Sequence, residues 1–101
     1  MNGGQLIAAE RTRQIEDEKW TAEHDDEHRR GELAQAGACY AIAACVHSHH
    51  GLNAAELSPP PQWPYDDEWW KPVSDPIRNL VKAGALIAAE IDRLQRKIKT
   101  K

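Results

Sequence analysis

The fold class is decided by residues 75–98, which read DPIRNLVKAGALIAAEIDRLQRKI. Asp75 followed by Pro76 is typical of a helix start, because the carboxylate can accept from free backbone N–H groups and proline lacks the donor that would go unpaired. Apolar or small residues then recur at alternating spacings of three and four, which places them on one helical face. These residues are Ile77, Leu80, Gly84, Ile87, Ile91, Leu94 and Ile98. The sequence therefore predicts a helix over 75–98 whose apolar face packs against a neighbouring helix.

Two further helices are expected, over about 4–19 and 27–46. Residues 31–46 are almost wholly small or apolar, and Gly31 and Gly37 within them each cost about 1 kcal/mol of helix propensity relative to alanine. Close helix packing would offset that cost, with Gly84 facing one of these glycines. The first helix is expected to be the least buried, because its apolar residues are sparse: Leu6, Ile7, Ala9 and Ile15. The predicted fold is all-α, a small three-helix bundle forming a single domain over 1–101.

Length and composition exclude several classes of protein. The chain has 101 residues and a formal net charge of -3, which argues against binding nucleic acid mainly through phosphate neutralisation. No apolar run approaches the length of about 20 residues that crosses a bilayer, and the first residues do not resemble a signal peptide. We therefore expect a cytoplasmic protein. Cys39 and Cys45 lie six apart on one expected helix, too far for a disulfide, and are expected to be reduced core residues.

A long connection, His47 to Ser74, follows the second expected helix. Its sequence SPPPQWP over 58–64 cannot continue a helix, because proline removes donors and disfavours helical geometry before it. Trp63, Tyr65, Trp69 and Trp70 lie in this connection, although a flexible linker has no need of large apolar groups. We expect the segment to cover the helical core, and the alternative is a partner-binding surface formed by these four residues.

An acidic-histidine cluster, EHDDEH at 23–28, is the candidate metal site. His28 and Glu32 are four apart and can share a helical face, and facing helices often supply further carboxylates to such sites. Mg²⁺ or Mn²⁺ suits carboxylates, whereas imidazole favours zinc, iron or nickel. The candidate ligands are His24, Asp25, His28, Glu32, Glu10 and Glu90. The alternative is that the aspartates cap a helix and the histidines are solvated.

The chain contains a short internal echo, because LIAAE occurs at 6–10 and again at 86–90. In each copy an arginine follows three residues after the glutamate, at Arg13 and Arg93. Glutamate and arginine at this spacing can pair along a helix surface. Five identical residues do not establish a duplication.

Six motifs occur in order along the chain: AERTRQI at 9–15, WTAEHDD at 20–26, GELA at 31–34, WP at 63–64, WWKP at 69–72 and RNLVKAGALI at 78–87. This set resembles a family of small proteins found in bacteriophages and prophages, to which no biochemical activity is attached. The resemblance covers most of the chain and implies a phage or prophage origin, and with it a location in the cytoplasm of a bacterial host cell.

A more distant similarity is to MazG-type all-α nucleotide pyrophosphohydrolases. It is carried by two antiparallel helices, one with His28 and the run GELA at 31–34 and one ending in AEID at 89–92. In that family, carboxylates one helical turn apart on facing helices hold magnesium, which bridges the triphosphate and activates water. Here Glu32 has His28 four residues before it in place of a carboxylate, and Asn79 stands where an acidic residue would be wanted.

Two functions are therefore expected as alternatives. The first is a non-catalytic phage accessory protein that binds a host or phage partner, or a small ligand. The second is a metal-dependent nucleotide pyrophosphohydrolase that uses the acidic-histidine cluster. A homodimer is compatible with both, since small-residue faces and apolar stripes favour helix association.

Overall fold

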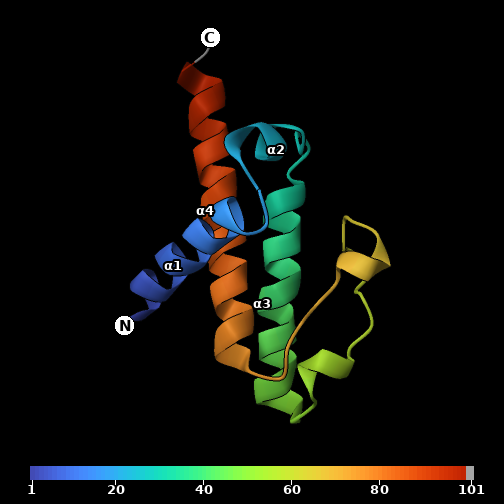
Figure 1. Cartoon of the computed structure of the whole chain (residues 1–101). Coiled ribbons are helices and arrows are strands. Elements are labelled where there is room, and N and C mark those ends of the chain that lie inside the picture. The colour runs from blue at the N-terminus through green and yellow to red at the C-terminus, as the bar shows by residue number, and fades with distance from the viewer. Residues whose placement is uncertain (100–101) are drawn as a thin grey trace.

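The computed structural model describes residues 1–99, whose regular secondary structure is entirely helical. The helices are α1 (Gly3–Glu16), α2 (Ala22–Asp26), α3 (Glu32–His50) and α4 (Pro76–Lys99), with two 3₁₀ turns, η1 (Ala54–Glu56) and η2 (Asp67–Trp69). α3 and α4 run antiparallel side by side, α1 crosses α4, and the connection between α3 and α4 lies along the opposite side of α3 (Figure 1). The prediction of an all-α bundle with three main helices is confirmed.

The first helix begins near the expected position and ends earlier than expected. The Asn2 side chain accepts from the Gln5 N–H at 2.9 Å, and the Gln5 side chain accepts from the Asn2 N–H at 2.8 Å, which forms a capping box. The expected end at residue 19 is wrong, because the helix stops at Glu16. Lys19 has φ +61°, and the Trp20 N–H donates to the Gln14 carbonyl, so the chain turns back at this point.

The second expected helix, over 27–46, is two separate helices. Gly31 has φ +80°, a left-handed conformation that interrupts an α-helix and that glycine adopts without steric cost. The acidic-histidine cluster therefore lies on α2 and the turn after it, and α3 begins at Glu32. α3 also continues beyond Val46 to His50, where Gly51 at φ +63° ends it. The predicted start at residue 27 and end at residue 46 are both wrong.

The core lies where α3 packs on α4. Leu33, Ala36 and Tyr40 of α3 contact a buried cluster that includes Leu86 and Ala89 of α4. Gly37 permits the close approach, since a Cβ added there would lie 3.0 Å from the Ala83 carbonyl oxygen. The expected contact of Gly84 with a glycine of α3 is wrong, because Gly84 instead lies against the Ile7 side chain of α1.

The apolar face predicted to pack α4 against α3 is instead largely exposed. The exposed residues are Ile77, Leu80, Ile87, Ile91, Leu94 and Ile98. α4 turns a different face toward α3, on which Ala83, Leu86 and Ala89 are buried. Small side chains on this second face let the two helix backbones approach closely, which bulkier isoleucines would prevent.

The connection folds back over the helices as expected. Trp70 is buried, its indole N–H donates to the Leu57 carbonyl at 2.9 Å, and the Lys71 N–H donates to the Tyr40 hydroxyl at 3.2 Å. Trp69 is 55 % exposed, so Trp70 covers the core as expected and Trp69 does not.

The two cysteines differ in burial, while both are free thiols. Cys39 is buried, and the expectation of a core position is wrong for Cys45, which is exposed. Among residues 1–99, no helix combines the length and apolar character that spanning a bilayer requires.

Candidate functional site

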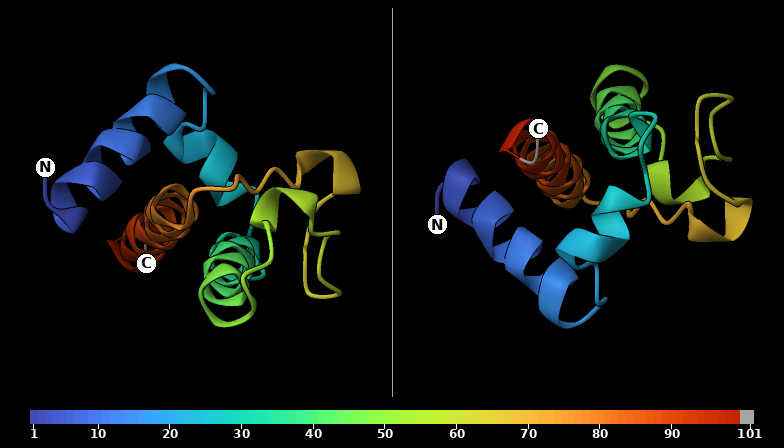
Figure 2. Two further views of the ribbon diagram at one scale, coloured as in Figure 1. Left: turned by 90° about the horizontal axis from the view of Figure 1, so that it is seen from below. Right: turned by 90° about the horizontal axis from the view of Figure 1, so that it is seen from above.

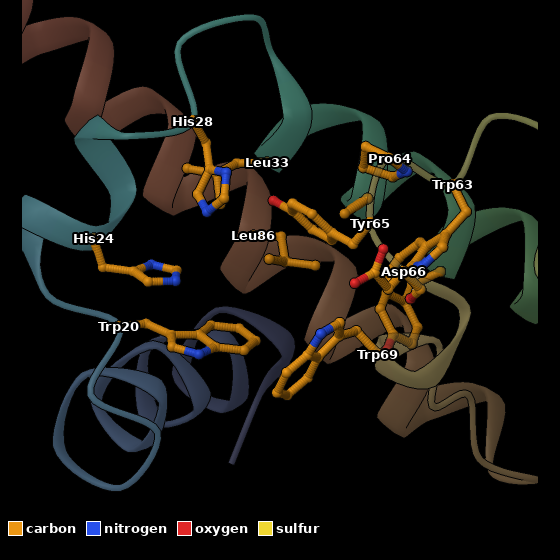
Figure 3. A pocket seen from close by; sticks show the side chains of 12 residues that line it. Trp20, His24, His28, Leu33, Trp63, Pro64, Tyr65, Asp66, Trp69 and Leu86 are labelled. Carbon is orange, nitrogen blue, oxygen red and sulfur yellow. Dashed lines mark hydrogen bonds between the residues drawn. The ribbon is translucent and has the colours of Figure 1, made fainter.

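A cavity of about 480 Å³ opens between α2, the first half of α3 and the connection (Figure 3). Its lining is dominated by aromatic and imidazole rings with a small apolar floor. The lining residues are Trp20, His24, His28, Leu33, Ala36, Tyr40, Trp63, Pro64, Tyr65, Asp66, Trp69 and Leu86. Cavities of roughly 300–1,000 Å³ with mostly apolar walls and a few polar groups are typical of small-molecule sites.

Ring-to-ring contacts form one wall of the cavity. The Trp63 ring meets Tyr65 at 5.4 Å between centroids, and it meets Tyr40 at 5.8 Å, both in edge-to-face geometry. The Trp63 indole N–H donates to the Asp66 carbonyl at 3.1 Å, and this hydrogen bond fixes the orientation of the Trp63 ring within the connection. Trp69 is the exposed indole at the mouth of the cavity.

A row of rings forms the opposite edge. Trp20 and His24 are nearly parallel, with an interplanar angle of 5° and centroids 6.0 Å apart. His24 lies 5.0 Å from His28, and His28 lies 5.1 Å from Tyr65. The Thr21 hydroxyl caps α2 by accepting from the His24 N–H at 3.4 Å, so this short helix sets the direction of the row.

Tyr65 remains a neutral phenol over the ordinary pH range. Burial raises the pKa of Tyr65, and the nearby negative charges of Glu32, Asp25 and Glu90 raise this pKa further. A neutral phenol can donate a hydrogen bond as well as accept one. The cavity therefore combines apolar ring faces with a polar edge formed by Tyr65 and the imidazoles of His24 and His28.

The carboxylates of the predicted metal set mostly face arginines. The buried Asp25 accepts from Arg11 at 3.1 Å and lies 3.3 Å from the His24 Nδ1 atom. The buried Glu10 accepts from Arg13 at 2.8 Å and from Arg78 at 2.6 Å. Burial acts to raise the pKa of Glu10, but the hydrogen bonds and charges of these two arginines outweigh burial and hold the pKa below its ordinary value.

The glutamates of the two LIAAE copies, Glu10 and Glu90, each form an ion pair with the arginine three residues later. Glu90 accepts from the Nε of Arg93, as Glu10 does from Arg13, so the predicted pairing along the helix is present in both copies. Glu10 has the additional partner Arg78, which links α1 to α4 across 68 residues of sequence. These carboxylates serve as structural ion-pair partners.

His28 and Glu32 form the remaining pair, with 3.4 Å between His28 Nδ1 and Glu32 Oε2. Burial acts to raise the pKa of Glu32, but its hydrogen bonds with the Arg30 and Glu32 backbones and with His28 lower the pKa overall. Among residues 1–99, no group of three or more His, Cys, Asp or Glu side chains is arranged to hold a metal ion. The predicted metal set is thus divided: two histidine–carboxylate pairs join His24 to Asp25 and His28 to Glu32, while Glu10 and Glu90 are paired with arginines.

The cavity unites residues that the sequence assigned to two unrelated sites. His24 and His28 were candidate metal ligands, whereas Trp63, Tyr65 and Trp69 were candidate partner-binding residues, and all five line the same space. Trp70 of that second set is buried behind Trp63, with 5.0 Å between ring centroids.

The sequence did not single out seven of the lining residues: Trp20, Leu33, Ala36, Tyr40, Pro64, Asp66 and Leu86. It also gave no sign of Arg11, the partner of Asp25. A signal for Trp20 was present, because Trp20, His24 and His28 follow one another at intervals of four. No local pattern pairs Arg11 with Asp25.

Comparison of the chain with protein-family models, with curated proteins and with solved structures gave no match.

Proposed function

We propose that this chain is a non-catalytic binding protein of phage or prophage origin, and that its cavity takes a small planar aromatic molecule. The observation that carries the proposal is the cavity wall, where Trp20, Tyr65 and Trp69 present ring faces and edges around an open space of about 480 Å³. Aromatic rings stabilise a planar ligand by stacking and edge-to-face contact. The resemblance to small phage proteins supplies the biological setting.

The lining restricts the chemistry of the ligand. Leu33 and Leu86 form an apolar floor that favours a ring system over a flexible polar chain. On one edge, Tyr65 offers a hydroxyl donor, and His24 and His28 offer ring nitrogens that donate or accept according to tautomer. A bicyclic heteroaromatic molecule with hydrogen-bonding atoms along one edge matches this arrangement.

Ligand-observed NMR with a panel of indoles, quinolines and free nucleobases tests the proposal. At least one class should bind saturably, and Trp69→Ala and Trp20→Ala should each weaken that binding at least tenfold. Leu52→Ala is the matched control, because Leu52 is 51 % exposed, close to the 55 % of Trp69, and does not line the cavity. Lack of binding by every panel member, or equal binding by all four proteins, would contradict the proposal.

The second candidate function is a metal-dependent nucleotide pyrophosphohydrolase. It is supported by the position of the acidic-histidine cluster, because His24 and His28 border the cavity that could receive a base. It is weakened by the arginine partners of Glu10, Asp25 and Glu90, which already neutralise the carboxylates that a divalent ion would need. A panel of nucleoside triphosphates with Mg²⁺ or Mn²⁺ decides this candidate: pyrophosphate release abolished by Glu32→Ala would support it, and absence of turnover would remove it.

A further inference from the structure

One long side of α4 is apolar and uncovered. α3 packs on the side of α4 that carries Leu86, and α1 crosses another side at Gly84. The third side carries six large apolar residues, each between 43 % and 71 % exposed: Ile77, Leu80, Ile87, Ile91, Leu94 and Ile98. We call these six residues the α4 stripe. Seen end-on, α1 and α3 lie on two sides of α4, and the described chain leaves the remaining side open (Figure 2).

The α4 stripe is larger than the scattered exposed leucines of an ordinary surface. It runs from residue 77 to residue 98, a length of about 33 Å at 1.5 Å per residue. Its six side chains together expose about as much as three fully exposed residues. Contiguous apolar surface on this scale marks an interaction site, whereas single exposed apolar residues do not.

The spacing of the α4 stripe fits a helix as its partner. Counting Gly84, which Ile7 of α1 covers at the edge of the stripe, the intervals alternate between three and four residues over three heptads, the spacing of a two-helix coiled-coil seam. Beside the seam, Val81, Ala83 and Ala88 carry no charge, and Glu90 is already paired with Arg93, so close approach of another helix would bury no unpaired carboxylate. Lys97, also beside the seam, lies in the basic last turn of the helix. A partner helix therefore needs a seam of similar length and spacing.

The surface around the α4 stripe also has the breadth of a dimer interface. Ile87 lies against Gly37 of α3, where a Cβ added at Gly37 would be 3.1 Å from the Ile87 Cγ1 atom. Further along that flank of α3, Ala34, Ala38 and Ile42 are exposed. A typical specific interface buries about 800 Å² on each partner, which a stripe on one helix together with its neighbour can supply.

We infer that the α4 stripe is occupied by the α4 stripe of a second copy of this chain, with the two helices antiparallel. A two-fold axis near Ile87, the midpoint of the stripe, would match the full length of each seam to the other. Parallel pairing would set two basic ends side by side, since Arg96, Lys97 and Lys99 lie in the last turn. Antiparallel pairing instead brings each basic end to the start of the other α4, where Asp75 lies, and opposes the two helix dipoles.

Sedimentation equilibrium tests the association. The wild-type chain should sediment at twice the chain mass, and its melting temperature should rise with protein concentration. The double variant Leu80→Lys with Ile91→Lys should be monomeric with unchanged helical circular dichroism, because both residues are already 51 % exposed. Leu52→Lys is the control, since Leu52 has the same 51 % exposure and lies outside the stripe. A monomeric wild-type chain, a double variant that still dimerises, or a Leu52→Lys variant that dissociates equally would overturn the inference.

Cysteine cross-linking tests the orientation. In a Cys45→Ser background, which removes the exposed thiol, Ile77→Cys and Ile98→Cys chains are mixed and oxidised. Antiparallel pairing should give disulfides mainly between unlike variants, because residue 77 of one chain then lies opposite residue 98 of the other. Disulfides mainly between like variants would overturn the antiparallel arrangement.

Discussion

At the scale of single residues, α1 is joined to the molecule by buried ion pairs as well as by the packing of Ile7 on Gly84. Its buried side chains are Glu10 and Gln14, while Ile15 is exposed. Glu10 joins α1 to α4 through Arg78, and Arg11 joins α1 to α2 through Asp25. A buried ion pair contributes little net stability, but removing one partner is costly because the other remains desolvated.

Glu10→Gln is therefore expected to destabilise the fold. Arg13 and Arg78 would lose their carboxylate, and since both are more than one third exposed, water would replace part of the loss. We expect a loss of about 2 kcal/mol in the free energy of unfolding, below the roughly 3–5 kcal/mol of a fully buried pair. Urea denaturation measures it. Glu18→Gln is the control, because Glu18 pairs with the same Arg13 but is 45 % exposed, and its loss should stay below about 1 kcal/mol.

The same variant should change the acid limb of stability. The folded pKa of Glu10 lies below its ordinary value of 4.5, so its ionised form stabilises the fold above that pH. This contribution is lost as the pH falls through the folded pKa. The unfolding free energies of the wild-type chain and of Glu10→Gln should therefore converge as the pH falls below 4.5. A gap that stays constant into acid would show that Glu10 acts through packing and not through its charge.

At the scale of elements, one backbone conformation separates the acidic-histidine cluster from α3. Gly31 at φ +80° ends the turn after α2 and allows α3 to begin at Glu32. The turn directs His28 toward Tyr65 at the edge of the cavity. A continuous helix over 27–46 would have carried the histidines along the axis of α3 instead.

Gly31→Ala is expected to destabilise the fold by about 1 kcal/mol, because a side chain at this left-handed φ meets the carbonyl oxygen. The cause is local backbone strain and not crowding by the rest of the fold, since the nearest atom outside residues 30–32 that an added Cβ would meet is Glu90 Oε2 at 3.9 Å. Gly31→Asn should lose less, since asparagine tolerates this conformation. Gly3→Ala, where an added Cβ meets nothing within 4 Å, should not destabilise. Urea denaturation of the three variants checks the order, and equal losses for Gly31→Ala and Gly31→Asn would exclude strain as the cause.

At the scale of the whole molecule, the sequence predicted where the helices lie in the chain better than which of their faces pack together. Helix 76–99 was predicted to within one residue at each end, because its cap and its periodicity are local properties. Which of its faces packs on α3 was not predictable from hydrophobicity. The isoleucine face is the more apolar of the two, but Ala83 and Ala89 permit the closer approach to Gly37 and Ala36.

The candidate site was predictable in its residues and not in its assembly. Trp63, Tyr65 and Trp69 attracted notice because large rings are unexpected in a proline-rich connection, and His24 and His28 because they lie among carboxylates. Their meeting around one cavity depends on the connection folding back toward α2, which no local pattern encodes. The same limit applies to Glu10 and Arg78, which pair across 68 residues.

The return of the connection depends on Trp70, and adjacent tryptophans allow a direct test. Trp70→Ala would leave a cavity beside Tyr40 and remove the hydrogen bond to the Leu57 carbonyl, so we expect a loss of about 3–5 kcal/mol in the free energy of unfolding. Trp69→Ala should change stability by no more than about 0.5 kcal/mol, because Trp69 is 55 % exposed. Thermal and urea unfolding, followed by circular dichroism, measure both. Equal losses for the two variants would mean that Trp69 stabilises the connection as much as the buried Trp70 does. Trp69 would then be a structural residue and would not be available to contact a ligand.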